Sequence, residues 1–219
     1  MEKKNKKMLV LGASLLAMFA LWTVLVRFVD VRAIGPEGSS VGFAALNGFV
    51  HKLTGVNWLL YNVTDWLGLV PIAVAIGFAI LGLTQLIKRK SLRKVDYSII
   101  ALGVFYIVII IAYIFFEMVV INYRPTRIDG YLEASYPSST TMLVLCVMPT
   151  AAMQMNWRIK NTVIRRCVII AIIAFTAFMV IGRLIAGVHW ITDIIGGALF
   201  SAGLVMMYYS IKNTPTKKY

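Results

Sequence analysis

The sequence has no long polar segment that would form a soluble domain, no internal repeat and no low-complexity tract. Of its 219 residues, 60% are hydrophobic and 14% are charged, whereas soluble domains are roughly 45–50% apolar. The mean hydropathy is +0.81. The two cysteines, Cys146 and Cys167, fall in apolar stretches, so we expect packing residues rather than a disulfide or a metal site. The chain is predicted to be an integral membrane protein.

Long apolar runs predict the membrane spans. Because no water satisfies backbone groups in the bilayer core, a span is either a helix or part of a closed barrel. The runs here are continuous rather than alternating, which favours an all-α fold with six transmembrane helices in one domain, residues 1–219. The fourth run is the weakest because it is short and carries Pro149 and Gln154. The predicted spans are residues 8–29, 66–87, 97–122, 138–156, 167–187 and 190–211.

Positive charge is concentrated at four places along the chain. Acidic residues are scarce, 9 against 22 Lys and Arg, and the net charge is +13. If the spans alternate, sixteen of the 22 basic residues share one side with both termini, which the positive-inside rule makes cytoplasmic. Topology therefore explains the basic excess, and we expect no nucleic-acid partner. The sixteen are Lys3, Lys4, Lys6, Lys7, Lys88, Arg89, Lys90, Arg93, Lys94, Arg158, Lys160, Arg165, Arg166, Lys212, Lys217 and Lys218.

The longest predicted non-spanning segment covers about residues 30–65, on the extracytoplasmic side. Within it Phe43, Leu46, Val50 and Leu53 recur at helical spacing. That spacing is typical of a helix lying in the membrane interface. Such a helix would be either a wall beside a lipid-accessible pocket or a simple connector.

Three ionisable residues interrupt the apolar sequence near the C-terminal end: Arg183, His189 and Asp193. Each such group in or beside a span costs several kcal/mol unless it is paired or hydrated. His189 and Asp193 are four residues apart, so on a helix they would share a face, and the carboxylate would orient the imidazole. These residues indicate a functional site on the extracytoplasmic side.

Further phosphate-binding groups are predicted on the same side. Arg124 follows the third span, and Ser138 and Ser139 open the fourth. Arginine offers planar donors suited to phosphate, and the free N–H groups of a helix N-terminus bind anions. Together with Arg183, these groups predict a phosphate site beside His189.

The motifs of this region resemble those of the type 2 phosphatidic acid phosphatase (PAP2) superfamily. The pattern of that family is Lys, six residues, Arg-Pro; then Pro-Ser-Gly-His; then Ser-Arg, five residues, His, three residues, Asp. The resemblance covers most of the chain, because the family core is six helices with these motifs at their outer ends. The matching residues are Arg124, Pro125, Pro137, Ser138, Arg183, His189 and Asp193.

The resemblance implies roles for the matching residues. His189 would be the nucleophile that forms a phosphohistidine, with Asp193 as its orienting partner. Arg124, Arg183 and Ser138 would bind the phosphate. No metal or other cofactor is expected, and the partner would be a phosphorylated membrane lipid. The oligomeric state is left open.

Three positions depart from the family pattern. Glu117 stands where the family has lysine, and it would repel phosphate, pair with Arg124 or Arg183, or be neutral through burial. Gly182 replaces a serine. Thr140 replaces the histidine that protonates the leaving group, and threonine is too weak an acid for that step.

The missing acid bears on the substrate. An ester leaves as an alkoxide, whose conjugate acid resembles water with a pKa of about 15.7, whereas a phosphate leaving from a diphosphate has a second pKa of about 6. We therefore expect a lipid phosphate or diphosphate phosphatase at the outer leaflet that prefers a lipid diphosphate, with undecaprenyl diphosphate in a bacterial plasma membrane as the candidate substrate. The alternatives are a PAP2-like pseudoenzyme that binds or transports a phosphorylated lipid, and a phosphotransferase.

Overall fold

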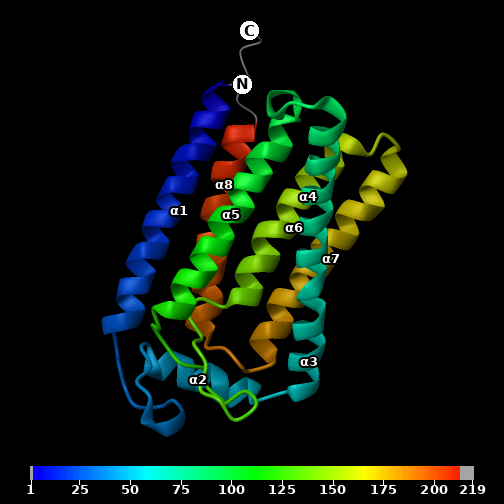
Figure 1. Cartoon of the computed structure of the whole chain (residues 1–219). Helices are drawn as coiled ribbons and strands as arrows, with labels where there is room; N and C mark the ends of the chain where they lie inside the picture. Colours follow the sequence, from blue (N-terminus) through cyan, green and yellow to red (C-terminus); the bar gives the residue numbers. More distant parts are fainter. Residues whose placement is uncertain (1, 213–219) are drawn as a thin grey trace.

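The computed structural model describes residues 2–212 and is almost entirely helical (Figure 1). Long helices run side by side as a bundle, and the shorter α2 lies across one end of it. Lys217 and Lys218 lie outside the described residues. The α-helices are α1 (Glu2–Phe28), α2 (Ala44–Thr54), α3 (Trp58–Leu67), α4 (Leu69–Arg89), α5 (Tyr97–Met118), α6 (Ser139–Arg158), α7 (Thr162–Ile185) and α8 (Ile191–Lys212).

Within residues 2–212, five stretches of helix are long and apolar enough to cross a membrane: α1, α3 continued by α4, α5, α7 and α8. The chain is thus a multi-pass, all-α membrane protein. The helix α6 is not among the five; it packs against α4, α5, α7 and α8 and buries Val144, Thr150 and Gln154. An enclosed helix needs no lipid-facing apolar surface, and a sixth span at α6 stays a prediction. Cys146 is buried on α6, whereas Cys167 is exposed on α7.

The helix of the second predicted span starts before residue 66. The Asn57 side chain caps α3 by accepting a hydrogen bond from Leu60 N at 2.9 Å. Gly68 then has helical dihedral angles, so α3 continues into α4 as one apolar stretch, Trp58–Arg89. Residues 58–65 are therefore helical and continuous with the predicted span of residues 66–87.

Two other boundaries also move. The helix α5 ends at Met118, before the predicted end at residue 122, because the chain there turns into a loop in which Tyr123 bridges Ala134. The helix α7 begins at Thr162, earlier than residue 167, because the Asn161 side chain accepts hydrogen bonds from the first turn.

The two ends of the bundle differ in charge. The start of α1, the end of α8 and the α4–α5 and α6–α7 connections lie at one end (Figure 1), where they gather the predicted cytoplasmic Lys and Arg residues of the described range. The α7–α8 connection, α2 and the loop after α5 lie at the other end. This asymmetry agrees with the predicted sidedness, which no membrane in the structure tests.

The helix α2 holds the start of α8 at this second end. The buried Asn47 amide donates to Gly42 O at 2.7 Å and to Thr192 Oγ1 at 3.0 Å, and its oxygen accepts from Thr192 N at 3.3 Å. Trp22 of α1 donates from Nε1 to Thr192 O at 3.1 Å. Leu53 lies on the outward side of α2 and is 71% exposed. The segment therefore supports the α8 N-terminus.

Replacing Asn47 with alanine should destabilise this end of the bundle. The change leaves backbone groups of Gly42 and Thr192 without partners, and losing a buried hydrogen-bond partner costs roughly 1–3 kcal/mol. Thermal unfolding in detergent should give a lower Tm for Asn47→Ala, whereas Leu46→Ala, at a site that is 41% exposed, should change it little. Equal Tm values for the two variants would contradict the supporting role of Asn47.

Candidate active site

The site forms where the α7–α8 connection meets the loop between α5 and α6. Residues 186–190 are not helical. Gly187 has φ +67°, a conformation that favours glycine, and a Cβ there would collide with the carbonyl oxygen of Gly55. His189 thus lies in a tight loop, while Asp193 lies in the first turn of α8. The two side chains do not share a helix face, although the fold brings His189 Nδ1 to 3.8 Å from Asp193 Oδ2.

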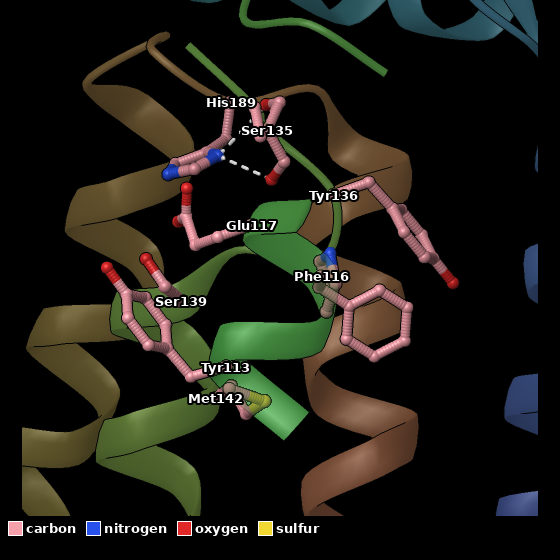
Figure 2. Close-up of a pocket in the computed structure, with 10 residues that line it drawn as sticks. Tyr113, Phe116, Glu117, Ser135, Tyr136, Ser139, Met142 and His189 are labelled. Carbon is pink, nitrogen blue, oxygen red and sulfur yellow. Dashed lines mark hydrogen bonds between the residues drawn. The ribbon is translucent and has the colours of Figure 1, made fainter. Parts of the chain in front are cut away.

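Ser135 connects the histidine to the carboxylate. Its hydroxyl donates to Asp193 Oδ2 at 2.5 Å and accepts from His189 Nδ1 at 3.1 Å, and its carbonyl oxygen lies 3.2 Å from the same Nδ1 (Figure 2). Asp193 Oδ2 also accepts from Trp190 N at 2.9 Å. All three interacting side chains are buried. Sequence reasoning missed Ser135 because it lies 54 residues before His189 and outside the motifs.

The hydrogen bonds of the His189 ring assign its tautomer. The guanidinium groups of Arg124 and Arg183 lie 3.3 and 3.4 Å from Nε2. Because arginine only donates, Nε2 must accept, which leaves the ring proton on Nδ1 facing Ser135. Nε2 is therefore unprotonated and lies between two guanidinium groups.

The ring is also kept neutral by its surroundings. Burial lowers the pKa of His189 well below its ordinary value of 6.5, and the charges of Arg124 and Arg183 lower it further. The hydrogen bond to the Ser135 carbonyl acts in the opposite direction and is a smaller effect. The imidazole is therefore the free base at pH 7.

Each of the two arginines is paired with a carboxylate that sequence reasoning did not assign. Arg124 Nε lies 3.0 Å from Glu133 Oε2, and backbone hydrogen bonding between Arg124 N and Glu133 O, 3.1 Å, joins the two sides of the loop. The Arg183 side chain is 1% exposed, and Nη1 lies 3.5 Å from Asp65 Oδ1 of α3. The sequence offered only a weak signal for these pairs: Asp65 lies beside the outer end of a predicted span, and Glu133 lies in the loop that follows Arg124.

The hydroxyl groups at the start of α6 fall into two sets. Ser138 is buried and caps α6, accepting from Thr141 N at 3.5 Å, while its own N–H donates to Asp193 O at 3.1 Å. It lines neither cavity at the site, so its phosphate contact stays a prediction. Ser139 and Thr140 do line the wide cavity described below.

Gly182 has a packing explanation. It is buried on α7, and a Cβ at this position would lie 2.8 Å from Thr64 Cγ2 of α3. The Thr64 hydroxyl accepts from Arg183 Nη1 at 3.4 Å. A serine would therefore crowd α3, and Thr64 supplies a hydroxyl beside the arginine instead.

Two cavities meet beside His189. The small one, about 10 Å³, is lined by His189, Ser139 and Glu117 among others (Figure 2). The wide one, about 610 Å³, contains Arg124 and Arg183 and shares Ser139 and Glu117 with the first. Glu117 points toward the His189 ring (Figure 2). Within residues 2–212 it forms no ion pair, and both arginines pair with other carboxylates.

Comparisons with known proteins agree with this arrangement. The sequence model of the PAP2 superfamily matches residues 39–217. The chain belongs to the PAP2 superfamily. Its fold is similar to the crystal structure of the first transmembrane PAP2 type phosphatidylglycerolphosphate phosphatase from Bacillus subtilis, with 20% identity, a TM-score of 0.60, and coverage of 91% of this chain and 94% of that one. No curated protein matches.

The PAP2 motif positions converge from three parts of the chain. Arg124 comes from the loop after α5, Ser139 and Thr140 from the start of α6, and Arg183 and His189 from the end of α7 and the following loop. In the part of the chain that the structure describes, no group of three or more His, Cys, Asp and Glu side chains is arranged to hold a metal ion.

His189 should titrate below pH 6.5. Protonation would add a third positive charge beside two buried guanidinium groups, so the folded protein keeps the ring neutral down to a lower pH. NMR of histidine-labelled protein in micelles would follow the titration, because the chain has two histidines and His51→Asn identifies the other signal. Arg124→Gln removes one charge and should raise the pKa of His189. A wild-type pKa at or above 6.5 would contradict the assigned tautomer and environment.

Proposed function

We propose that this chain is a membrane lipid phosphatase that transfers a phosphoryl group to His189 and then to water. The observation that carries the proposal is the orientation of the ring, with Nε2 facing Arg124 and Arg183 and Nδ1 held by Ser135. Membership of the PAP2 superfamily supports the lipid phosphatase class.

The contacts suggest how the first step proceeds. Nε2 attacks phosphorus while the two guanidinium groups bind the phosphate oxygens, which gather charge as the bond to the leaving group breaks. The imidazole becomes positive as it is phosphorylated. Asp193 stabilises that charge through the Ser135 hydroxyl, because its Oδ2 accepts the hydroxyl proton at 2.5 Å.

We place the site at the extracytoplasmic face of a six-span domain in a bacterial plasma membrane, with α6 as the enclosed span and both termini cytoplasmic. The basic end of the bundle, opposite to the site, supports this placement. Exposed apolar side chains adjoin the cavity residues in sequence: Trp66 is 74% exposed beside Asp65, and Met118 is 78% exposed beside Glu117. A lipid would therefore reach the wide cavity laterally, between α3 and α5.

A lipid diphosphate is the proposed substrate class, with undecaprenyl diphosphate as the candidate. The wide cavity of about 610 Å³ falls within the range of roughly 300–1,000 Å³ typical of ligand sites. Thr140 lines that cavity where the family pattern has an acid, and it cannot protonate an alkoxide. A departing phosphate does not need that proton.

His189→Ala should abolish phosphate release from every lipid substrate, because in the described part of the chain His189 is the side chain that accepts from both arginines. Phosphate release from a panel of lipid mono- and diphosphates would be measured in detergent, with His51→Ala as the matched histidine control. Release that persists in His189→Ala would contradict the proposed mechanism. Tight binding of phosphorylated lipid by wild type without release would favour the pseudoenzyme.

Thr140→His should increase cleavage of monophosphates selectively. General acid catalysis is typically worth about 10²–10⁴ in rate, and an alkoxide gains more from it than a phosphate does. The ratio of kcat/KM for phosphatidic acid to that for a polyprenyl diphosphate should therefore rise in the variant. Wild type that cleaves both lipids equally fast would contradict the diphosphate preference, and an equal gain for both would contradict the leaving-group explanation.

A further inference from the structure

We propose that Glu117 is the proton donor for the leaving group, and that the resulting carboxylate then takes a proton from the attacking water. The inference rests on the proposed phosphatase function and names the residue that supplies its acid–base chemistry. It assigns to one side chain the work that Thr140 cannot do.

The position of Glu117 carries the inference. Glu117 lies one residue before the end of α5 and lines both the small cavity beneath His189 and the wide cavity that holds the arginines. Its carboxyl group points toward the His189 ring (Figure 2). A phosphate bound between Nε2 and the arginines would therefore have Glu117 at its edge, where the wide cavity receives the rest of the lipid.

The other acidic groups of the two cavities are occupied or too weak. Glu133 pairs with Arg124 at 3.0 Å, and Asp65 pairs with Arg183 at 3.5 Å. Tyr113 lines both cavities, but an ordinary tyrosine pKa of about 10 makes it a much weaker acid than a carboxyl group. Among the residues that line these cavities, Glu117 is the carboxyl group without an ion-pair partner.

The charge balance of the site favours a protonated Glu117 when substrate is bound. The two arginines are each matched by one carboxylate, so no positive charge is left over for a third. An anionic phosphate beside an ionised Glu117 would place two negative charges together, which disfavours the ionised form. Substrate binding thus favours the protonated form of Glu117, which carries the proton that the leaving group requires.

The two steps balance in protons and bonds. In the first, His189 Nε2 forms a bond to phosphorus, the bond from phosphorus to the leaving oxygen breaks, and the Glu117 proton moves to that oxygen. In the second, Glu117 removes a proton from water as the water oxygen bonds to phosphorus. The bond from phosphorus to Nε2 then breaks and returns its electron pair to the nitrogen. Inorganic phosphate leaves, and Glu117 is protonated again.

Glu117→Gln should separate substrates by their leaving groups. Glutamine has nearly the same shape but cannot give up a proton, so cleavage of phosphatidic acid should fall by about 10²–10⁴-fold. Cleavage of a polyprenyl diphosphate should fall much less, because a departing phosphate needs no proton. The measurement is kcat/KM for both lipids in detergent. The control is Asp129→Asn, because the Asp129 carboxyl group lies in the loop after α5 and lines neither cavity.

The outcomes distinguish this inference from the proposed function. If His189→Ala abolishes release but Glu117→Gln slows both lipids equally, the phosphatase proposal stands and the proton-donor role fails. If Tyr113→Phe rather than Glu117→Gln produces the selective loss, the donor is the tyrosine. Glu117→Gln with Thr140→His adds a second test. If Glu117 is the donor, the new imidazole should raise phosphatidic acid cleavage by a larger factor in the Glu117→Gln background than in wild type, whereas equal factors would contradict the donor role.

Discussion

A buried carboxylate at the start of α8 is the constraint on which the rest of the site depends. The Asp193 side chain is 0% exposed, and burying a charge is costly unless hydrogen bonds compensate. Trp190 N and the Ser135 hydroxyl supply such bonds to Oδ2, and the Asp193 backbone carbonyl accepts from Ser138 N. One residue thereby joins the α7–α8 loop, the loop after α5 and the start of α6.

The positive groups of the site are held in an apolar setting by charge pairing. Arg183 is almost fully buried. It is tolerable there because it forms an ion pair with Asp65, its Nη1 donates to the Thr64 hydroxyl, and the Tyr61 ring lies 5.2 Å from the guanidinium. The Glu133 carboxylate does the same for Arg124. A bound phosphate must therefore share the arginines with these carboxylates or displace them. The ion pairs hold the guanidinium groups in place, but they also reduce the net positive charge that the phosphate meets.

The sequence was most informative where the signal was local. Continuous apolar runs predicted the long helices, and the spacing of Arg183, His189 and Asp193 marked the site. Helix boundaries failed where side chains decide them, as when Asn57 and Asn161 cap helices ahead of the apolar runs. Sequence reasoning did not identify Ser135, Asp65 and Glu133, because their partners lie far along the chain or are determined by packing. Thr64 and Arg183, for example, are in contact at a sequence separation of 119. No periodicity or motif encodes such contacts.

Glu117 and Thr140 are best understood together. The resemblance would place a cation at the first position and an acid at the second, and this chain has an acid at the first and a hydroxyl at the second. Both side chains line the wide cavity. The Glu117 carboxyl group can therefore supply the acid that is missing at position 140, but it does so at the position where the family has a phosphate-binding lysine. The site then binds phosphate with two arginines instead of three positive groups. A substrate whose leaving group departs readily makes the smallest demand on both functions, which is why the two substitutions point to the same class of lipid.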